Sequence, residues 1–428
     1  MGEAAPANRK TTAPRAARWA WALYDWAGDG FSAVIVAYVF SAYFTRALAS
    51  DPETGTTQWG AALAVAGVAA AVSAPLAGAI ADRGGAVKPW LAVATLLTAA
   101  ATAGLWFVAP GAMAVPLALV LVAIASYGSE LSKVFYNSML PRLVPVEKQG
   151  RLSGQGWALG YFGGLACLAL VYVLVLGGQT AGDEVAQAMR TVGPVVALWL
   201  ILFALPLFVL TPDRASTHAG LRRAAREGLG RMRAILSDVW HDRNLRQFLI
   251  ARLVYTDGTG TLFAFGGVYA AGTFDLEVHE VLLFGVALNV AGGLGALLGG
   301  WIDDRIGPRR TILAALCGVI ASGAPLLFVE GQALLWAFGI PLGFCLGPIQ
   351  PASRSLLARL APEDREAQMF GFFATSGKIT AFLGPALVAL FTALFGTQRA
   401  GMAVVVLFFV GGALLILPVS DRPRRASA

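Results

Sequence analysis

The chain has 428 residues, of which 57% are hydrophobic and only 13% are charged. Soluble globular domains carry about 25% charged residues, so the composition excludes that class and indicates an integral membrane protein. The formal net charge is +7, and membrane topology accounts for it, so we expect no nucleic-acid partner.

Twelve long apolar runs follow one another along the chain. An α-helix needs about 20 apolar residues to cross the hydrocarbon core, whereas a spanning β-barrel would show shorter, alternating segments. The sequence therefore predicts an all-α membrane protein with twelve transmembrane helices. They are expected near residues 19–45, 58–81, 89–109, 113–135, 153–177, 191–210, 246–272, 280–302, 311–329, 332–357, 367–394 and 400–418.

The basic residues predict the orientation, since cytoplasmic loops carry the excess of Lys and Arg. With the N-terminus inside, 25 of the 32 basic residues fall in inward loops, linker and tails, and three fall in outward loops. We therefore expect both termini to be cytoplasmic. The compact loops and the Ala-, Gly- and Arg-rich composition favour an inner membrane, and we expect a monomer in contact with the membrane lipids. Its parts would be a tail (1–18), a six-helix bundle (19–210), a basic cytoplasmic linker (211–246), a second six-helix bundle (247–418) and a tail (419–428).

The linker holds five closely spaced arginines that predict a basic amphipathic helix lying against anionic headgroups. They are Arg222, Arg223, Arg226, Arg231 and Arg233. A binding site for a partner is the alternative interpretation of the same residues.

The two halves of the chain resemble each other. GAIADRGGAVK after the second run matches GGWIDDRIGPRR after the eighth, and SMLPRLVP after the fourth matches SLLARLAP after the tenth. Asp29-Gly30 in the first run likewise matches Asp257-Gly258 in the seventh. A parallel six-plus-six repeat is the plan of transporters that rock two bundles around a midplane site. The predicted fold is therefore the major facilitator architecture.

The repeated loops end in Asp82-Arg83 and Asp304-Arg305. An aspartate at a helix end can accept hydrogen bonds from the N-terminus of a neighbouring helix, and the arginine can pair with acids or headgroups. We expect these four residues to form a gating latch on the cytoplasmic side, with positive-inside anchoring as the alternative.

Further charges lie in the helices near the same side. Glu130 and Lys133, three residues apart on one helix, are expected to pair. We interpret both, with Arg252 and Arg354, as gating or structural residues.

Acids within apolar runs carry the main functional indication. An ionised side chain at the bilayer centre costs about 2.5 to 3.5 kcal/mol and usually faces water or a partner. Residue counting places Asp29, Asp257, Asn289 and Lys378 near mid-membrane, and Asp25 nearer the cytoplasmic face. Lys378 can pair with Asp29 or Asp257, or bind a substrate carboxylate. Proton uptake would compete with pairing and couple protons to transport; a permanent ion pair is the alternative.

Aromatic side chains flank these charges. Tyr24, Trp157 and Tyr255 are predicted to form cavity walls with polar tips, against the alternative of simple packing. The stretch ATSGKIT has the wrong spacing for a phosphate loop, and the dispersed Cys and His residues form no metal-ligand pattern. We therefore expect no enzyme activity, no cofactor and no metal site.

Several segments resemble the vacuole effluxer-like family of the major facilitator superfamily, which is typified by a fungal amino-acid effluxer of autophagy. They include YDWA at 24–27, FYN at 135–137, GWALGY at 156–161, FLIAR at 248–252 and SGK at 376–378. The resemblance implies efflux of neutral amino acids. Gly28-Asp29 departs from the small polar pair usual after YDWA, and this adds an acid.

Three hypotheses follow. The first is a secondary transporter for a small organic solute such as an amino acid or a similar metabolite, with protons as the coupling ion. The second is an exporter of lipids or amphipathic drugs. The third is a non-transporting membrane receptor or scaffold, in which the central acids would be sealed in dry ion pairs.

Overall fold

The computed structural model describes residues 12–109, 111, 113–177, 183–214 and 240–421, and every regular element in these ranges is helical. Ten helical segments in this part of the chain are long and apolar enough to cross a membrane. The all-α, multi-pass membrane fold is therefore confirmed. The five linker arginines predicted to form a surface helix lie outside the described residues.

The elements divide at the linker into two sets. The first set is α1 (Arg15–Phe31), η1 (Ser32–Tyr38), α2 (Val39–Tyr43), η2 (Phe44–Leu48), α3 (Pro52–Gly84), α4 (Lys88–Gly104), η3 (Leu105–Phe107), α5 (Ala114–Ser138), α6 (Leu140–Leu143), η4 (Val146–Lys148), α7 (Gln149–Val171), η5 (Tyr172–Leu176) and α8 (Asp183–Leu210). The second is α10 (Arg243–Phe274), α11 (Val278–Ile306), α12 (Pro308–Gly323), η6 (Pro325–Leu327), α13 (Gln332–Leu346), α14 (Ile349–Leu360), α15 (Glu366–Ser376), α16 (Leu383–Phe395) and α17 (Gln398–Ile416).

Short polar side chains begin several of these helices. The Asp51 carboxylate accepts a hydrogen bond from the Thr54 N–H at the start of α3 (2.8 Å), which satisfies a donor that the helix itself leaves free. Asp213, beyond the end of α8, accepts hydrogen bonds from the N–H groups of Val87 and Lys88 at the start of α4. The residues that follow α8 are thereby tied to the first set of helices.

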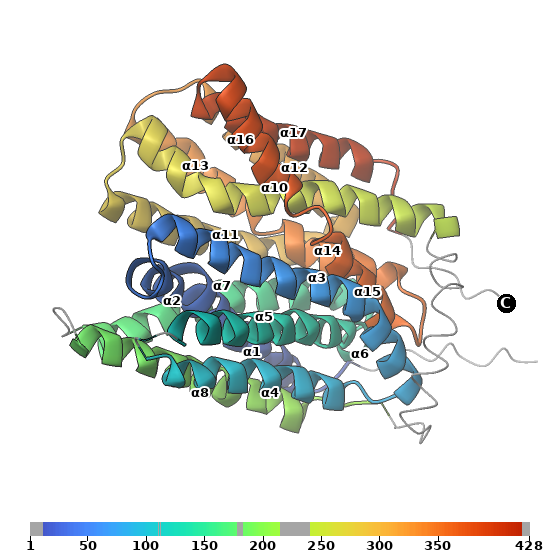
Figure 1. Cartoon of the computed structure of the whole chain (residues 1–428). Coiled ribbons are helices and arrows are strands. Elements are labelled where there is room, and N and C mark those ends of the chain that lie inside the picture. The colour runs from blue at the N-terminus through green and yellow to red at the C-terminus, as the bar shows by residue number, and fades with distance from the viewer. Residues whose placement is uncertain (1–11, 110, 112, 178–182, 215–239, 422–428) are drawn as a thin grey trace, which may run out of the picture.

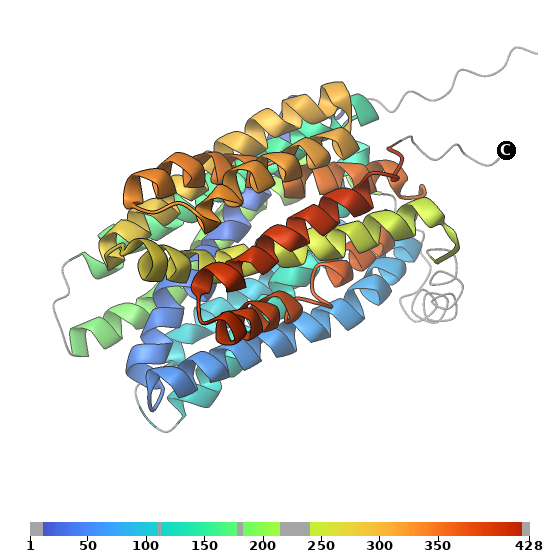
Figure 2. The ribbon, with the colours of Figure 1, turned by 90° about the horizontal axis from the view of Figure 1, so that it is seen from above.

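The helices lie side by side in two groups (Figures 1 and 2). In Figure 1, α4, α5 and α8 lie below, and α10, α12, α16 and α17 lie above. Contacts between the groups are made by α3 with α15, by α7 with α11 and α14, and by α5 with α15. We call the end where α8 stops and α10 starts the linker end, and the opposite end the far end.

Two predicted spans are broken in the structure. The run 332–357 divides into α13 and α14 at Gly347-Pro348, where the glycine and the proline disfavour a continuous helix. The run 367–394, predicted as one helix, divides into α15 and α16, with turns over residues 377–382. Gly377 disfavours helix there, and Pro385, in the first turn of α16, has no N–H to bond back to residue 381. Hydropathy does not detect this break because the segment stays apolar throughout.

The run 246–272 corresponds to α10, which is 32 residues long. It is not among the ten apolar segments, and it carries Arg243, Arg246, Arg252 and Asp257. When α10 and the broken run 367–394 are added to the ten apolar segments, the helices follow one another along the chain in the predicted order.

Candidate functional site

The two repeated aspartates hold the halves together at the linker end. Asp82, near the end of α3, accepts hydrogen bonds from the backbone N–H groups of Ala367 (3.2 Å) and Gln368 (2.8 Å) at the start of α15. Asp304, near the end of α11, accepts one from the Arg151 N–H (3.1 Å) at the start of α7. Each carboxylate thus meets the positive end of a helix in the other half, which is a favourable arrangement.

The arginines that follow these aspartates differ from each other in exposure. Arg305 is exposed, whereas Arg83 is only partly exposed. Arg83 takes part in an interaction within the structure. Sequence symmetry between the two loops therefore extends to the acids, but not to the environment of the arginines.

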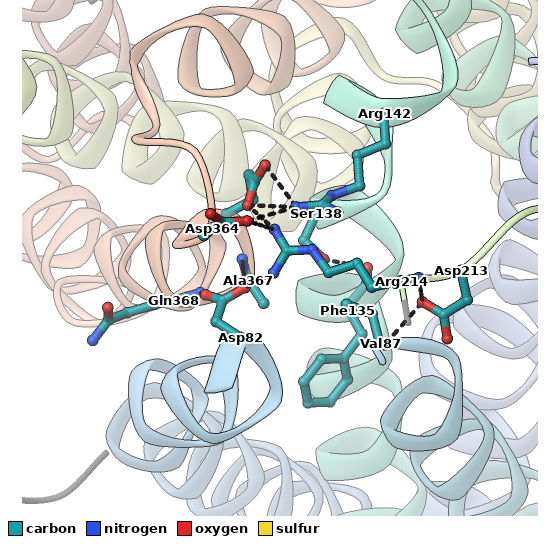
Figure 3. A network of polar contacts seen from close by, with 11 residues as sticks. Asp82, Val87, Phe135, Ser138, Arg142, Asp213, Arg214, Asp364, Ala367 and Gln368 are labelled. Atoms are coloured by element: carbon teal, nitrogen blue, oxygen red, sulfur yellow. Dashed lines mark hydrogen bonds and ion pairs between the residues drawn. The ribbon is translucent and has the colours of Figure 1, made fainter. Parts of the chain in front are cut away.

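A buried network of charges reinforces the Asp82 contact (Figure 3). Arg214, just beyond α8, forms ion pairs with Asp82 (3.3 Å), with Asp364 (3.5 Å) and with Glu366. Arg142 of α6 approaches Glu366 at 3.1 Å from another side. The Glu366 side chain is only 4% exposed. Two arginines from outside the second half thus hold one buried carboxylate of that half.

Sequence reasoning did not select these residues. Arg142 lies in the repeated SMLPRLVP segment, which was a usable signal. Arg214 had no signal of its own, since it is one of eight arginines in the linker region. Glu366 precedes an apolar run and resembles an ordinary loop acid.

Deeper in the molecule, Arg354 of α14 crosses to the first half. Its Nη1 lies 3.1 Å from the Asp25 carboxylate and donates to the Asn137 side chain at 3.0 Å. Its Nε and Nη2 donate to the hydroxyl (2.8 Å) and carbonyl oxygen (2.6 Å) of Ser153. The Tyr136 hydroxyl donates to the same carboxylate at 2.9 Å. This pair is well satisfied, as a buried ion pair must be.

Aromatic rings enclose that arginine. The guanidinium lies 4.8 Å from the Trp21 ring centroid and 6.0 Å from that of Trp157. Gly156 leaves the necessary space, because a Cβ there would lie 2.6 Å from the Asp25 Oδ2 and 3.0 Å from the Arg354 Nη2. Trp157 therefore contacts the Asp25–Arg354 pair as part of its surroundings.

A second ion pair joins the halves at Lys378. Its Nζ lies 3.3 Å from Glu130 of α5, and Lys133 lies 3.5 Å from the same carboxylate. The expected Glu130–Lys133 pairing is confirmed, but the expected pairing of Lys378 with Asp29 or Asp257 is wrong. Glu130 belongs to this inter-half group because the break at 377–382 carries Lys378 toward α5. The Lys378 and Lys133 side chains remain 40% and 45% exposed.

Asp29 lies beside these charges without a direct partner. No hydrogen bond or ion pair of its carboxylate occurs within the described part of the chain, although Lys133 and Arg354 lie close enough to act on it electrostatically. The carboxylate lies against α7, where a Cβ on Gly160 would fall 2.2 Å from its Oδ2. Asp29 is therefore available to bind a proton or a cationic group.

Asp257 lies elsewhere, against the start of α16, and is 5% exposed. No hydrogen-bond partner of its carboxylate occurs among the described residues. Five residues earlier, Arg252 donates to the carbonyl oxygen of Phe373 (2.6 Å) and to the hydroxyl of Ser376 (2.9 Å) at the end of α15. Arg252 therefore anchors α15 to α10 within the second half.

The two tyrosines predicted as cavity walls are buried within their own halves. The Tyr24 hydroxyl shares a hydrogen bond with Thr95 and that of Tyr255 with Ser353, each at 2.6 Å. Both hydroxyls therefore meet partners within their own halves in this state, and a place of either ring in a cavity wall stays a prediction. Asn289 of α11 donates to the Gly285 carbonyl of its own helix and stays partly exposed.

The bonds between the halves share one region. Among the described residues, the hydrogen bonds and ion pairs named for this interface extend from the linker end to the Lys378–Glu130 pair. The Thr375 hydroxyl donates a further hydrogen bond to the Ala71 carbonyl oxygen (2.6 Å). The structure is thus a state closed at the linker end. Within the same residues no group of three or more His, Cys, Asp or Glu side chains is placed to hold a metal ion.

Comparison with known proteins places this architecture among membrane transporters. A family model described as vacuole effluxer Atg22 like matches residues 60–427. The chain is 24% identical over 412 residues to an uncharacterized MFS-type transporter, YxiO, of Bacillus subtilis, and the match covers 94% of each chain. Among solved structures, FucP in the outward conformation shares the fold, with a TM-score of 0.77 at 17% identity over 95% of this chain and 98% of its own.

Fungal proteins are also similar. Autophagy-related protein 22 of Cryptococcus neoformans var. neoformans serotype D is 27% identical over 295 residues, which cover 64% of this chain and 52% of the fungal protein. The chain thus spans about half the length of that relative. The likenesses together establish the major facilitator fold.

Proposed function

Since the chain belongs to the vacuole effluxer Atg22-like family of major facilitator transporters, we propose that it is a proton-coupled secondary transporter of a small organic solute, an amino acid or a similar metabolite. The substrate class and the direction, efflux, rest on the family description. The protein would lie in the inner membrane with its linker end toward the cytoplasm. The two six-helix bundles would rock around the charged centre between them.

The observation that carries the proposal is the charge group around Lys378, to which both halves contribute. Glu130 and Lys133 of α5 and Lys378 of the break leave two half-exposed ammonium groups beside the unpartnered Asp29. A zwitterionic solute has the complementary charges, because its carboxylate can replace Glu130 at a lysine and its ammonium group can meet Asp29. Binding would then disturb the Lys378–Glu130 contact between the halves.

The latch at the linker end supplies the second requirement of alternating access. Asp82, Asp304, Arg214 and the Arg354–Asp25 pair all join one half to the other. We propose that these bonds break together when the linker end opens, and that Arg83 and Arg305 assist from the periphery. A monomer contains all of these groups, so no second copy is needed.

The test is flux through proteoliposomes that contain the purified full chain. Vesicles loaded with a mixture of amino acids are given a pH gradient, and the external medium is analysed by mass spectrometry. Release of particular amino acids that depends on the gradient supports the proposal. Asp29→Asn removes the carboxylate proposed to meet the ammonium group and should lose the release itself, whereas Asp51→Asn, at an exposed helix start, should retain it.

Two outcomes would replace the proposal. Movement of fluorescent lipids or amphipathic drugs without amino-acid release would favour the second hypothesis, an exporter of such molecules. Absence of any gradient-dependent flux, with intact folding, would favour a receptor or scaffold.

A further inference from the structure

The break between α15 and α16 is an ordered structure. Turns closed by hydrogen bonds between residues three apart replace the helix. The N–H groups of Lys378, Ala381 and Leu383 donate to the carbonyl oxygens of Thr375 (3.0 Å), Lys378 (3.2 Å) and Thr380 (2.7 Å), respectively. A broken membrane helix exposes two new helix ends, and in transporters such ends take part in binding ions and substrates. Both new ends here face side chains of α10.

The α15 end is fully engaged by a cation. Arg252 is 6% exposed, bonds the Phe373 carbonyl and the Ser376 hydroxyl, and lies 3.4 Å from the Phe373 ring centroid. A positive group at a helix C-terminus is favourable because the free carbonyls carry partial negative charge. Arg252 thereby fixes the first side of the break.

The α16 end faces an anion that lacks a hydrogen-bond partner. The Asp257 carboxylate is turned toward the Gly384 N–H in the first turn of α16, but neither of its oxygens has a hydrogen-bond partner among the described residues. Gly384 permits this approach, since a Cβ there would lie 1.9 Å from the Thr261 Oγ1 and 3.3 Å from the Asp257 Oδ1. The second side of the break is therefore held by charge without a formed bond.

Few other charges surround Asp257. The described residues of α16 carry no titratable side chain, α13 carries only Cys345, and the charges of α11 lie near its two ends. Arg399 of α17 is bound near the Val329 carbonyl (3.0 Å) at the far end. In α15, which also packs against α10, the one titratable side chain is Glu366 at the linker end, where it pairs with Arg142 and Arg214. The ionisable groups that remain near this part of α10 are Arg252 and Tyr255 on the helix itself and Lys378 in the break.

We propose that Asp257 is the coupling proton site and that the break transmits its protonation to the Lys378–Glu130 contact. A proton from water on one side of the membrane adds to a carboxylate oxygen of Asp257 and is later released to water on the other side. Ionised Asp257 attracts the positive end of α16 and keeps the first turn of that helix formed. Neutral Asp257 does not attract it, so the first turn of α16 loosens and Lys378 leaves Glu130. Asp29 then serves the solute. The inference rests on the proposed proton coupling, and it assigns proton binding to Asp257 and solute binding to Asp29.

Hydrogen exchange of the break tests this assignment without any substrate. The full chain in lipid nanodiscs is followed by mass spectrometry from about pH 4 to about pH 9, where buried carboxyls titrate, with rates corrected for intrinsic exchange. Peptides that cover residues 377–384 should exchange about two- to fivefold faster as Asp257 is protonated, the range expected for one charge at a helix terminus. Asp257→Asn should exchange at the faster rate throughout, and Asp257→Glu should restore the titration.

Asp29→Asn is the matched control, since it removes a similar acid from α1 and should leave the titration of the break unchanged. Titration that persists in Asp257→Asn, or a break that does not respond to pH in the wild type, overturns the inference. These results are independent of flux. Gradient-driven flux without titration of the break would retain the proposed function and remove this site, whereas titration without gradient-driven flux would retain the site and remove proton-coupled transport.

Discussion

Gly156→Ala is predicted to weaken the closed state of the linker end through the Asp25–Arg354 pair. The new Cβ would lie 2.6 Å from the Asp25 Oδ2, 3.0 Å from the Arg354 Nη2 and 3.1 Å from the Tyr136 hydroxyl. Normal contact needs about 3.5 Å, so the carboxylate must retreat by about 0.9 Å. Its bonds of 2.9 Å and 3.1 Å would then lengthen to about 4 Å, beyond hydrogen-bond range.

Two charge-assisted hydrogen bonds are affected, but only the Asp25–Arg354 bond joins the halves and enters the balance between the states; such a bond is worth about 1.5 to 3 kcal/mol. Partial relaxation and water entry reduce the net effect, so we expect a shift of about 2 kcal/mol, or about 30-fold, toward the open linker end. The pair joins the two halves and cannot persist once they separate. The cost of losing the Arg354 bond therefore falls on the closed state, whereas the cost of weakening the Tyr136 bond, which lies within the first half, falls on both states.

Electron-spin distance measurement checks this shift. Spin labels are attached to cysteines that replace Lys148 and Glu363, which are exposed at the linker end of opposite halves. In a chain without the native cysteines, the distance between the two labels reports the separation of the halves at that end. Gly28→Ala is the matched control, because a Cβ on Gly28 would meet nothing within 4 Å. Equal distance distributions in Gly156→Ala and Gly28→Ala would refute the reasoning.

Three further substitutions test other parts of the account. Gly160→Ala places a Cβ 2.2 Å from the Asp29 Oδ2 and should lower gradient-driven flux about tenfold or more at unchanged thermal stability; flux equal to that of Gly60→Ala, where the space is open, would contradict this. Glu366→Gln removes the buried carboxylate that pairs with Arg214 and Arg142, although Asp82 and Asp364 still contact Arg214, and should destabilise the closed linker end by about 1.5 to 3 kcal/mol, seen as longer label distances; unchanged distances would show that the network is not a latch. Tyr255→Phe removes a bond within one half only, so melting should report a loss of about 1 kcal/mol while flux stays within about twofold; a much larger loss of flux would return Tyr255 to the substrate site.

The sequence predicted those features that depend on position along the chain. Apolar run length gave the helices and their order, and the repeated loops identified Asp82 and Asp304, whose hydrogen bonds to helix N-termini are present. The spacing of Glu130 and Lys133 was sufficient to predict their pairing. In each case the relevant geometry is local or is repeated in both halves.

Features that depend on helix rotation were not predictable. Residue counting gives the depth of Asp29 and Asp257 but leaves open which neighbour each one faces; α7 contacts the first and α16 the second. The Lys378–Glu130 pair also required the break at 377–382, which a continuously apolar run conceals. The partners of Tyr24 and Tyr255 were not predictable for the same reason, because packing within each half decides which way a ring points.

Proton movement driven by a solute gradient tests the central claim most directly. Proteoliposomes that contain the full chain and an internal pH indicator are given a gradient of the amino acid found in the flux screen, without an imposed pH gradient. The account predicts a change in internal pH that depends on the solute and is absent in Asp257→Asn. Solute flux with no accompanying proton movement would contradict it.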